Sequence, residues 1–220
     1  METTKHTLQP QSIVRSKSTN RVLKNTYLLL SATLCFSAIT AMFSATLQLP
    51  HPGLILTLAG YFGLLFLTTK FRNSLYGLYC VFALTGFMGY TLGPIIAAYW
   101  SMAPMVVMQA LGGTAVVFFS LSALALNTKR DFSFLGKSLL IGVLVAFLAG
   151  LGALLFEIPA LSLAVSAMFV LLMSGMILYE TNQIVRGGET NYIMATVSLY
   201  VAIFNLFMSL MHLLGFAQSE

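Results

Sequence analysis

The residues best suited to chemistry lie in one short stretch, 178–192, with the sequence LYETNQIVRGGETNY. The chain has only six acidic residues, and two of them, Glu180 and Glu189, fall here on either side of Arg186. An acid so near the end of an apolar segment has two interpretations. It belongs to a solvated helix end, loosely paired with Arg186, or it lines a cavity and takes up protons or cations there. The residues alone leave both interpretations open.

A second group of small and polar residues follows in the last apolar segment, about 191–215. Its members recur every three or four residues and therefore share one face of a helix. They are Ala195, Ser198, Ala202, Asn205, Ser209 and His212. Polar groups that face lipid are costly, so this stripe is predicted to point inward and to make its helix the central one. Asn205 and His212 are predicted to stabilise the bundle by hydrogen bonds, and Asn205 joins Glu180 and Arg186 as a candidate sensor of protons or cations.

Motifs of membrane-embedded enzymes are missing from the sequence. There is no H-E-x-x-H motif for a zinc protease. Ser174 and Gly175 with His212 resemble part of a serine protease site, but Leu172 occupies the place of the flanking glycine. The last segment carries no deep lysine for a chromophore. We predict that the protein is not an enzyme and needs neither a cofactor nor a metal.

The composition predicts the medium around these residues. Hydrophobic residues make up 58% of the chain and charged residues 8%, against roughly 25% charged residues in soluble domains. We therefore predict an all-α membrane protein, a bundle of seven transmembrane helices in contact with the lipid bilayer. The predicted helices form a domain over 26–216 and cover about 26–48, 53–70, 75–98, 104–127, 134–156, 160–184 and 191–215.

The positions of the basic residues predict the orientation. All eleven Lys and Arg fall in four polar stretches, 1–25, 70–74, 128–137 and 184–190, which alternate with stretches that have none. By the positive-inside rule the N-terminus is cytoplasmic, and the short tail 217–220 is periplasmic. Residues 1–25 are polar and basic and are predicted to be disordered. Because the cations are spread thinly, the net charge of +5 does not indicate nucleic-acid binding.

Small residues predict where the helices approach each other, since apolar association gives no driving force in lipid. The first segment has such a stripe at Ser31, Cys35, Ala38 and Ala45, and the third has one at Gly89, Gly93 and Ala97. Both stripes are predicted to pack against neighbouring helices. Cys35 and Cys80 are predicted to be buried as small apolar residues. Pro94 is predicted to kink the third segment.

Five segments resemble the Bax inhibitor family, and within it the bacterial YccA branch of modulators of the FtsH protease. They are KNTYLLLSATLCFSAITA (24–41), LPHPGLILTLAGYFGLLFLT (49–68), GFMGYTLGPIIAAY (86–99), ALGGTAVVFFSLSAL (110–124) and LYETNQIVRGGETNYIMATVSLYVAIFNLFMSLMHLLGF (178–216). The resemblance covers nearly all of the chain after residue 20. It implies seven helices around a central seventh, and an inner-membrane protein that binds FtsH and restrains its degradation of membrane substrates. The tail 1–25 would then serve as a handle for the protease.

The same resemblance implies an alternative, a pH-sensitive calcium or proton leak channel. In the channel members, two aspartates at the end of helix six and on helix seven share a proton. Here Glu180 stands at the first position, but Ala202 stands at the second. A single carboxylate cannot supply a shared-proton pair, so the channel ranks second, with Glu180 as its sensor.

Overall fold

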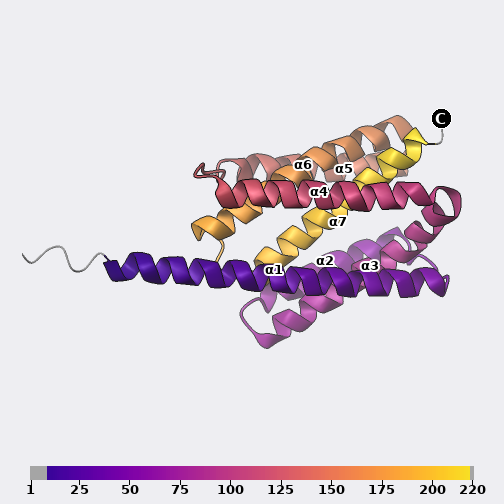
Figure 1. Cartoon of the computed structure of the whole chain (residues 1–220). Helices are drawn as coiled ribbons and strands as arrows, with labels where there is room; N and C mark the ends of the chain where they lie inside the picture. The colour runs from indigo at the N-terminus through magenta and orange to yellow at the C-terminus, as the bar shows by residue number, and fades with distance from the viewer. Residues whose placement is uncertain (1–8, 219–220) are drawn as a thin grey trace, which may run out of the picture.

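Seven α-helices make up the described part of the chain in the computed structural model, which covers residues 9–218 and the side chains of residues 19–218. The helices connect through short turns (Figure 1). Their bounds are α1 Gln9–Thr46, α2 Leu54–Lys70, α3 Leu75–Met102, α4 Pro104–Asn127, α5 Leu135–Leu155, α6 Pro159–Arg186 and α7 Tyr192–Ala217.

Helix α7 occupies the centre of the bundle, as the polar stripe predicted. It contacts α1 and α3 on one side and α4 and α6 on the other, and Figure 1 shows it passing between these two groups. More than half of its most apolar window is buried, the largest share among the candidate spans of the described residues. The outermost helices are α2, which packs on α3, and α5, which packs on α6.

Six of the helices are long and apolar enough to cross a membrane. They are α1, α3, α4, α5, α6 and α7, and they establish a multi-pass membrane protein. Helix α2 is equally apolar but has only 17 residues. The structure thus confirms the all-helical class, whereas the crossing of the membrane by all seven helices remains a prediction.

Helix α1 begins much earlier than the sequence predicted. It starts at Gln9 and runs for 38 residues, about 57 Å at the usual rise. The prediction of a disordered tail is therefore wrong for residues 9–25, and residues 1–8 lie outside the described part. Pro10 falls in the first helical turn, where a proline fits, and the segment that follows contains no glycine to interrupt it. Figure 1 shows this part of α1 projecting beyond the other helices.

Helices α1 and α3 pack closely enough to require glycine. A Cβ atom on Gly89 would lie 2.1 Å from the Thr40 hydroxyl oxygen and 2.3 Å from the Ser37 carbonyl oxygen, and one on Gly93 would lie 2.5 Å from the Ser44 Cβ atom. The predicted stripe of α3 is thus confirmed at both glycines. The predicted stripe of α1 is wrong, because α3 covers the neighbouring face of α1 instead.

The exposed positions on α1 identify the face that was predicted wrongly. Ser31, Cys35 and Ala38 are exposed, and Ala45 is half-buried. Cys80 is half-buried, so neither cysteine is buried as predicted. The helix turns its hydroxyl groups toward α3, which explains why small size alone did not identify the contact face.

Two hydroxyl groups satisfy the polar atoms between these helices. Pro94 has no N–H, so the carbonyl oxygen of Tyr90 loses its usual helical partner. The Ser44 hydroxyl of α1 donates to that oxygen at 3.0 Å. Deeper in the bundle, the Tyr200 hydroxyl of α7 lies 2.6 Å from the Ser37 hydroxyl and donates to the Thr85 carbonyl at 3.3 Å. A single hydroxyl group thereby joins α1, α3 and α7.

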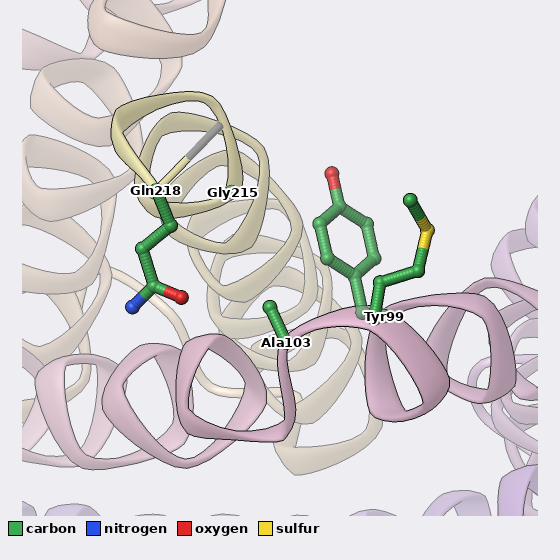
Figure 2. A pocket seen from close by; sticks show the side chains of 5 residues that line it. Tyr99, Ala103, Gly215 and Gln218 are labelled. Atoms are coloured by element: carbon green, nitrogen blue, oxygen red, sulfur yellow. The ribbon is translucent and has the colours of Figure 1, made fainter. Parts of the chain in front are cut away.

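The end of the bundle near the C-terminus contains a small pocket that no charged residue of the described range 19–218 lines. Its volume is about 190 Å³, and Tyr99, Met102, Ala103, Gly215 and Gln218 line it (Figure 2). A Cβ atom on Gly215 would lie 2.4 Å from the Tyr99 ring, so α7 meets α3 closely here. The pocket offers little chemistry, and the charged groups of the described residues, apart from Glu157, lie at the opposite end of the bundle.

Candidate functional site at the cationic end

The stretch 178–192 forms the turn between α6 and α7. Gly187 adopts a left-handed conformation with φ of 72° and ends α6, a conformation that glycine takes without strain. The Gly188 N–H then donates to the Gln183 carbonyl at 2.8 Å. A Cβ atom on Gly188 would lie 2.0 Å from the Gln183 side-chain oxygen. Gly187 is therefore required by its backbone conformation, whereas a side chain at position 188 would displace the Gln183 side chain.

Asn191 uses its whole side-chain amide in this turn. Its oxygen accepts from the backbone N–H groups of Ile193 and Met194 at 3.0 and 3.1 Å and so caps α7. Its nitrogen donates to the Arg72 carbonyl at 2.9 Å and to the Asn73 side chain at 2.8 Å. One residue thus starts the central helix and anchors the turn between α2 and α3.

Asn182 and Arg186 make equivalent contacts to the loop between α4 and α5. The Asn182 oxygen accepts from the Phe132 N–H at 3.1 Å, and its nitrogen donates to the Arg130 carbonyl at 3.2 Å. The Arg186 guanidinium donates to the Lys129 carbonyl. Asn182, Arg186 and Asn191, here called the loop latch, tie three turns together at one end of the bundle.

This end, here called the cationic end, carries the Lys and Arg residues of all three turns, 70–74, 128–137 and 184–190. Asp131 lies among them. The Ser133 backbone N–H donates to its carboxylate at 2.8 Å and lowers its pKa, and the Ser133 side chain and the charge of Arg186 act in the same direction. Asp131 therefore stays ionised at neutral pH and offsets part of the local positive charge.

The predicted site residues are brought together only in part. Glu180 is half-buried, and both the Ser198 hydroxyl of α7 and the charge of Glu189 act on its carboxyl group. Arg186 contacts the Lys129 carbonyl, and no ion pair with Glu180 exists in the described structure. The interpretation of Glu180 as loosely paired with Arg186 thus has no ion pair to support it among the described residues.

Asn205 lies two helical turns from Ser198, about 10 Å along α7. Its amide donates to the Val201 carbonyl of its own helix at 2.8 Å. It does not join Glu180 and Arg186 in one site, and the predicted bond between helices is not formed.

The residues of the α7 stripe are all at least partly buried. Ala195, Ala202 and Ser209 are buried, and Ser198, Asn205 and His212 are half-buried. His212 makes the expected bond between helices, because its Nδ1 atom lies 2.8 Å from the Ser166 hydroxyl of α6. Ser174 instead donates to the Val170 carbonyl at 2.7 Å, so the protease-like pairing of Ser174 with His212 does not occur.

The sequence analysis missed the amide side chains that hold the site together. Asn182 is almost fully buried, and both it and Asn191 lie within the stretch that was singled out for its charges. The signal was present, since an amide beside an apolar segment needs partners for two donors and two acceptor positions. The identity of those partners depends on tertiary structure. No group of three or more metal-ligating side chains occurs among residues 19–218.

Comparison with known proteins places this bundle in a family. The family profile described as "Inhibitor of apoptosis-promoting Bax1" matches residues 19–219. This chain belongs to the Bax inhibitor family. Within the family, it is 55% identical to the "Modulator of FtsH protease YccA" of Escherichia coli K12 over 204 residues, which cover 92% of this chain and 93% of that protein.

Two further relatives extend the comparison. An uncharacterized protein of Pseudomonas aeruginosa is 50% identical over 95% of both chains. An uncharacterized membrane protein of Vibrio cholerae is 44% identical over 93% of both chains. The predicted resemblance is confirmed. The name of the Escherichia coli relative describes a modulator of a protease and not an enzyme, in agreement with the prediction that this chain is not an enzyme.

Proposed function

We propose that this protein is an inner-membrane modulator of the FtsH protease, which binds the protease and restrains its degradation of membrane substrates. The observation that carries the proposal is the 55% identity to the Escherichia coli modulator along nearly the full length of both chains. A second strain's copy of that relative is named an inner membrane protein, which supports the same location for this chain.

The proposal includes an orientation in the membrane. All seven helices cross, because the 17 residues of α2 fall at the short end of the roughly 17 to 25 that a span requires. The cationic end faces the cytoplasm, in keeping with the positive-inside rule. The N-terminus is then cytoplasmic and the C-terminus periplasmic.

The modulator acts through the projecting part of α1. Residues 9–25, here called the arm, extend α1 beyond the bundle on the proposed cytoplasmic side (Figure 1). The arm presents an end of the chain that the protease can engage. The bundle behind this arm is held by the loop latch and by the Tyr200 hydroxyl. A protease that binds the arm cannot easily extract the compact bundle from the membrane. The protease therefore remains bound to this chain and degrades less of its substrate.

The test uses purified FtsH, a membrane substrate and the full chain in proteoliposomes. Substrate degradation should slow when the chain is present, and FtsH should co-purify with it from native membranes. Replacing residues 2–20 by a glycine-serine linker of equal length should abolish the slowing, since α1 still keeps residues 21–46 as a span. Unchanged slowing would refute the role of the arm. A full chain that neither slows degradation nor captures FtsH would refute the function.

One contact favours a second candidate function, a pH-sensitive calcium or proton leak. Glu180 is half-buried against the Ser198 hydroxyl of the central helix, with Glu189 close by. Calcium flux into liposomes that contain the chain, with a pH dependence removed by Glu180→Gln and kept by Glu157→Gln, would support this candidate. Glu157 is the matched control, because it lies in the turn between α5 and α6 at the opposite end. Absence of flux at every pH tested would exclude the leak.

A further inference from the structure

A large groove opens on the side of the bundle between α1 and α4. Its volume is about 1020 Å³, comparable with the largest pockets that hold small molecules. Side chains of α1 and α4 form its walls, Tyr200, Ile203 and Phe207 of α7 form its floor, and α3 closes the end next to Trp100. Figure 1 shows α7 passing between the two wall helices.

The walls of the groove are neutral and open to the bilayer. Among the residues whose side chains are described, no charged residue lines it. The α1 wall carries Ser31, Cys35 and Ala38, which are exposed because α3 covers another face of that helix. The groove follows α1 from Tyr27 to Thr46, about 28 Å at the helical rise. This length is close to the roughly 30 Å hydrocarbon thickness of a bilayer.

Each of the two walls has a lysine beyond the groove, at the cationic end of the bundle. Lys24 precedes Ser31 by seven residues, two helical turns, and therefore lies on the groove face of α1. Its side chain is exposed, and none of the side chains described in the structure forms an ion pair with it. On the other wall, the last α4 residue that lines the groove is Phe119. Helix α4 continues beyond it to Asn127 at the cationic end, and the exposed Lys129 follows the end of the helix. A neutral, membrane-facing groove thus leads to two positive charges at the level of the lipid headgroups.

We propose that this groove binds an anionic phospholipid, with acyl chains along α1 and the phosphate beside Lys24 and Lys129. Acyl chains match the neutral walls, and a phosphate matches the two cations. A neutral partner helix would also cover the small residues of α1, but it would bring no negative charge to Lys24, and Asp131 offsets only part of the positive charge around Lys129. Charge complementarity therefore selects the lipid, and lipid binding in this groove does not depend on the interaction with FtsH.

The headgroup is tested by native mass spectrometry of the full chain in detergent, with phosphatidylglycerol or phosphatidylcholine added at equal concentration. Phosphatidylglycerol should be retained preferentially, and Lys24→Gln and Lys129→Gln should each reduce that preference about fivefold. The control is Lys70→Gln, which removes a cation of the same end at the close of α2. Equal retention of both lipids, or an equal loss with the Lys70 variant, would overturn the proposal.

The acyl chains are tested by filling the groove. Ala38→Trp should reduce retention of phosphatidylglycerol, because the new ring occupies the space between α1 and α4. Ile39→Trp is the matched control, since Ile39 is 60% exposed and is not among the residues that line the groove. Retention that survives Ala38→Trp would show that the lipid lies elsewhere. A dimer that replaces the lipid adduct would assign the groove to a second copy and overturn the proposal.

Discussion

Asn191→Ala is the substitution that best tests the loop latch. It removes the cap of α7, worth about 1 kcal/mol, and two hydrogen bonds to the turn between α2 and α3, worth about 1 kcal/mol each. Because these contributions overlap, we expect a loss of about 2 to 3 kcal/mol, or about 30- to 150-fold in the folding equilibrium. Unfolding by SDS in mixed micelles, followed by circular dichroism, measures the loss.

Two further variants separate the parts of this effect. Asn191→Ser keeps a capping oxygen but cannot reach the Arg72 carbonyl, so it should lose about 1 to 2 kcal/mol and leave the start of α7 protected. Asn127→Ala is the control, because Asn127 is exposed and bonds only within its own helix at 2.9 Å. Hydrogen exchange should rise at residues 70–74 in both Asn191 variants. If exchange there is unchanged, the latch does not hold that turn.

Three further substitutions, two of them paired with a control substitution, test the packing. Gly89→Ala should lower the free energy of unfolding by about 1 to 3 kcal/mol in the same SDS assay, since its Cβ atom would overlap α1. Gly112→Ala is its control and should not lower that free energy, because the structure has open space around the new Cβ atom. Gly187→Ala should destabilise the turn between α6 and α7 by about 1 kcal/mol, because alanine is strained in the left-handed conformation of that residue. Faster proteolysis of this turn would measure the effect. His212→Ala should lower stability by about 1 kcal/mol and Asn205→Ala by less than about 0.5, and equal effects would refute the bond to Ser166.

The helices and the central position of α7 could be predicted because lipid imposes strong rules on sequence. Charged and polar groups are costly in hydrocarbon. This cost explains the length of the apolar segments, the confinement of cations to some of the turns and the small and polar stripe of α7. The start of α1 could not be predicted in this way. Residues 9–25 are polar enough to suggest disorder, but they contain no glycine, and their only proline falls in the first helical turn.

The candidate site was located but not correctly assembled. The charges of Glu180 and Arg186 made these residues the predicted site. The side-chain amides of Asn182 and Asn191 instead make most of the hydrogen bonds between turns. An amide in sequence shows a need for partners but not which loop supplies them. The same limit affected α1, where small size did not reveal that α3 would cover the hydroxyl face beside Ser31 and Cys35.

Tyr200→Phe distinguishes resistance to extraction from binding, if the proposed function holds. Traction on the arm of α1 acts on the contacts of α1 with the rest of the bundle, and the Tyr200 hydroxyl joins that helix to α3 and α7. Its loss should cost about 1 to 2 kcal/mol without changing the cationic end. FtsH should therefore be captured equally well, while the variant itself is degraded faster and protects the substrate less. Equal lifetimes of variant and parent in the presence of FtsH would show that the strength of the bundle does not set the inhibition.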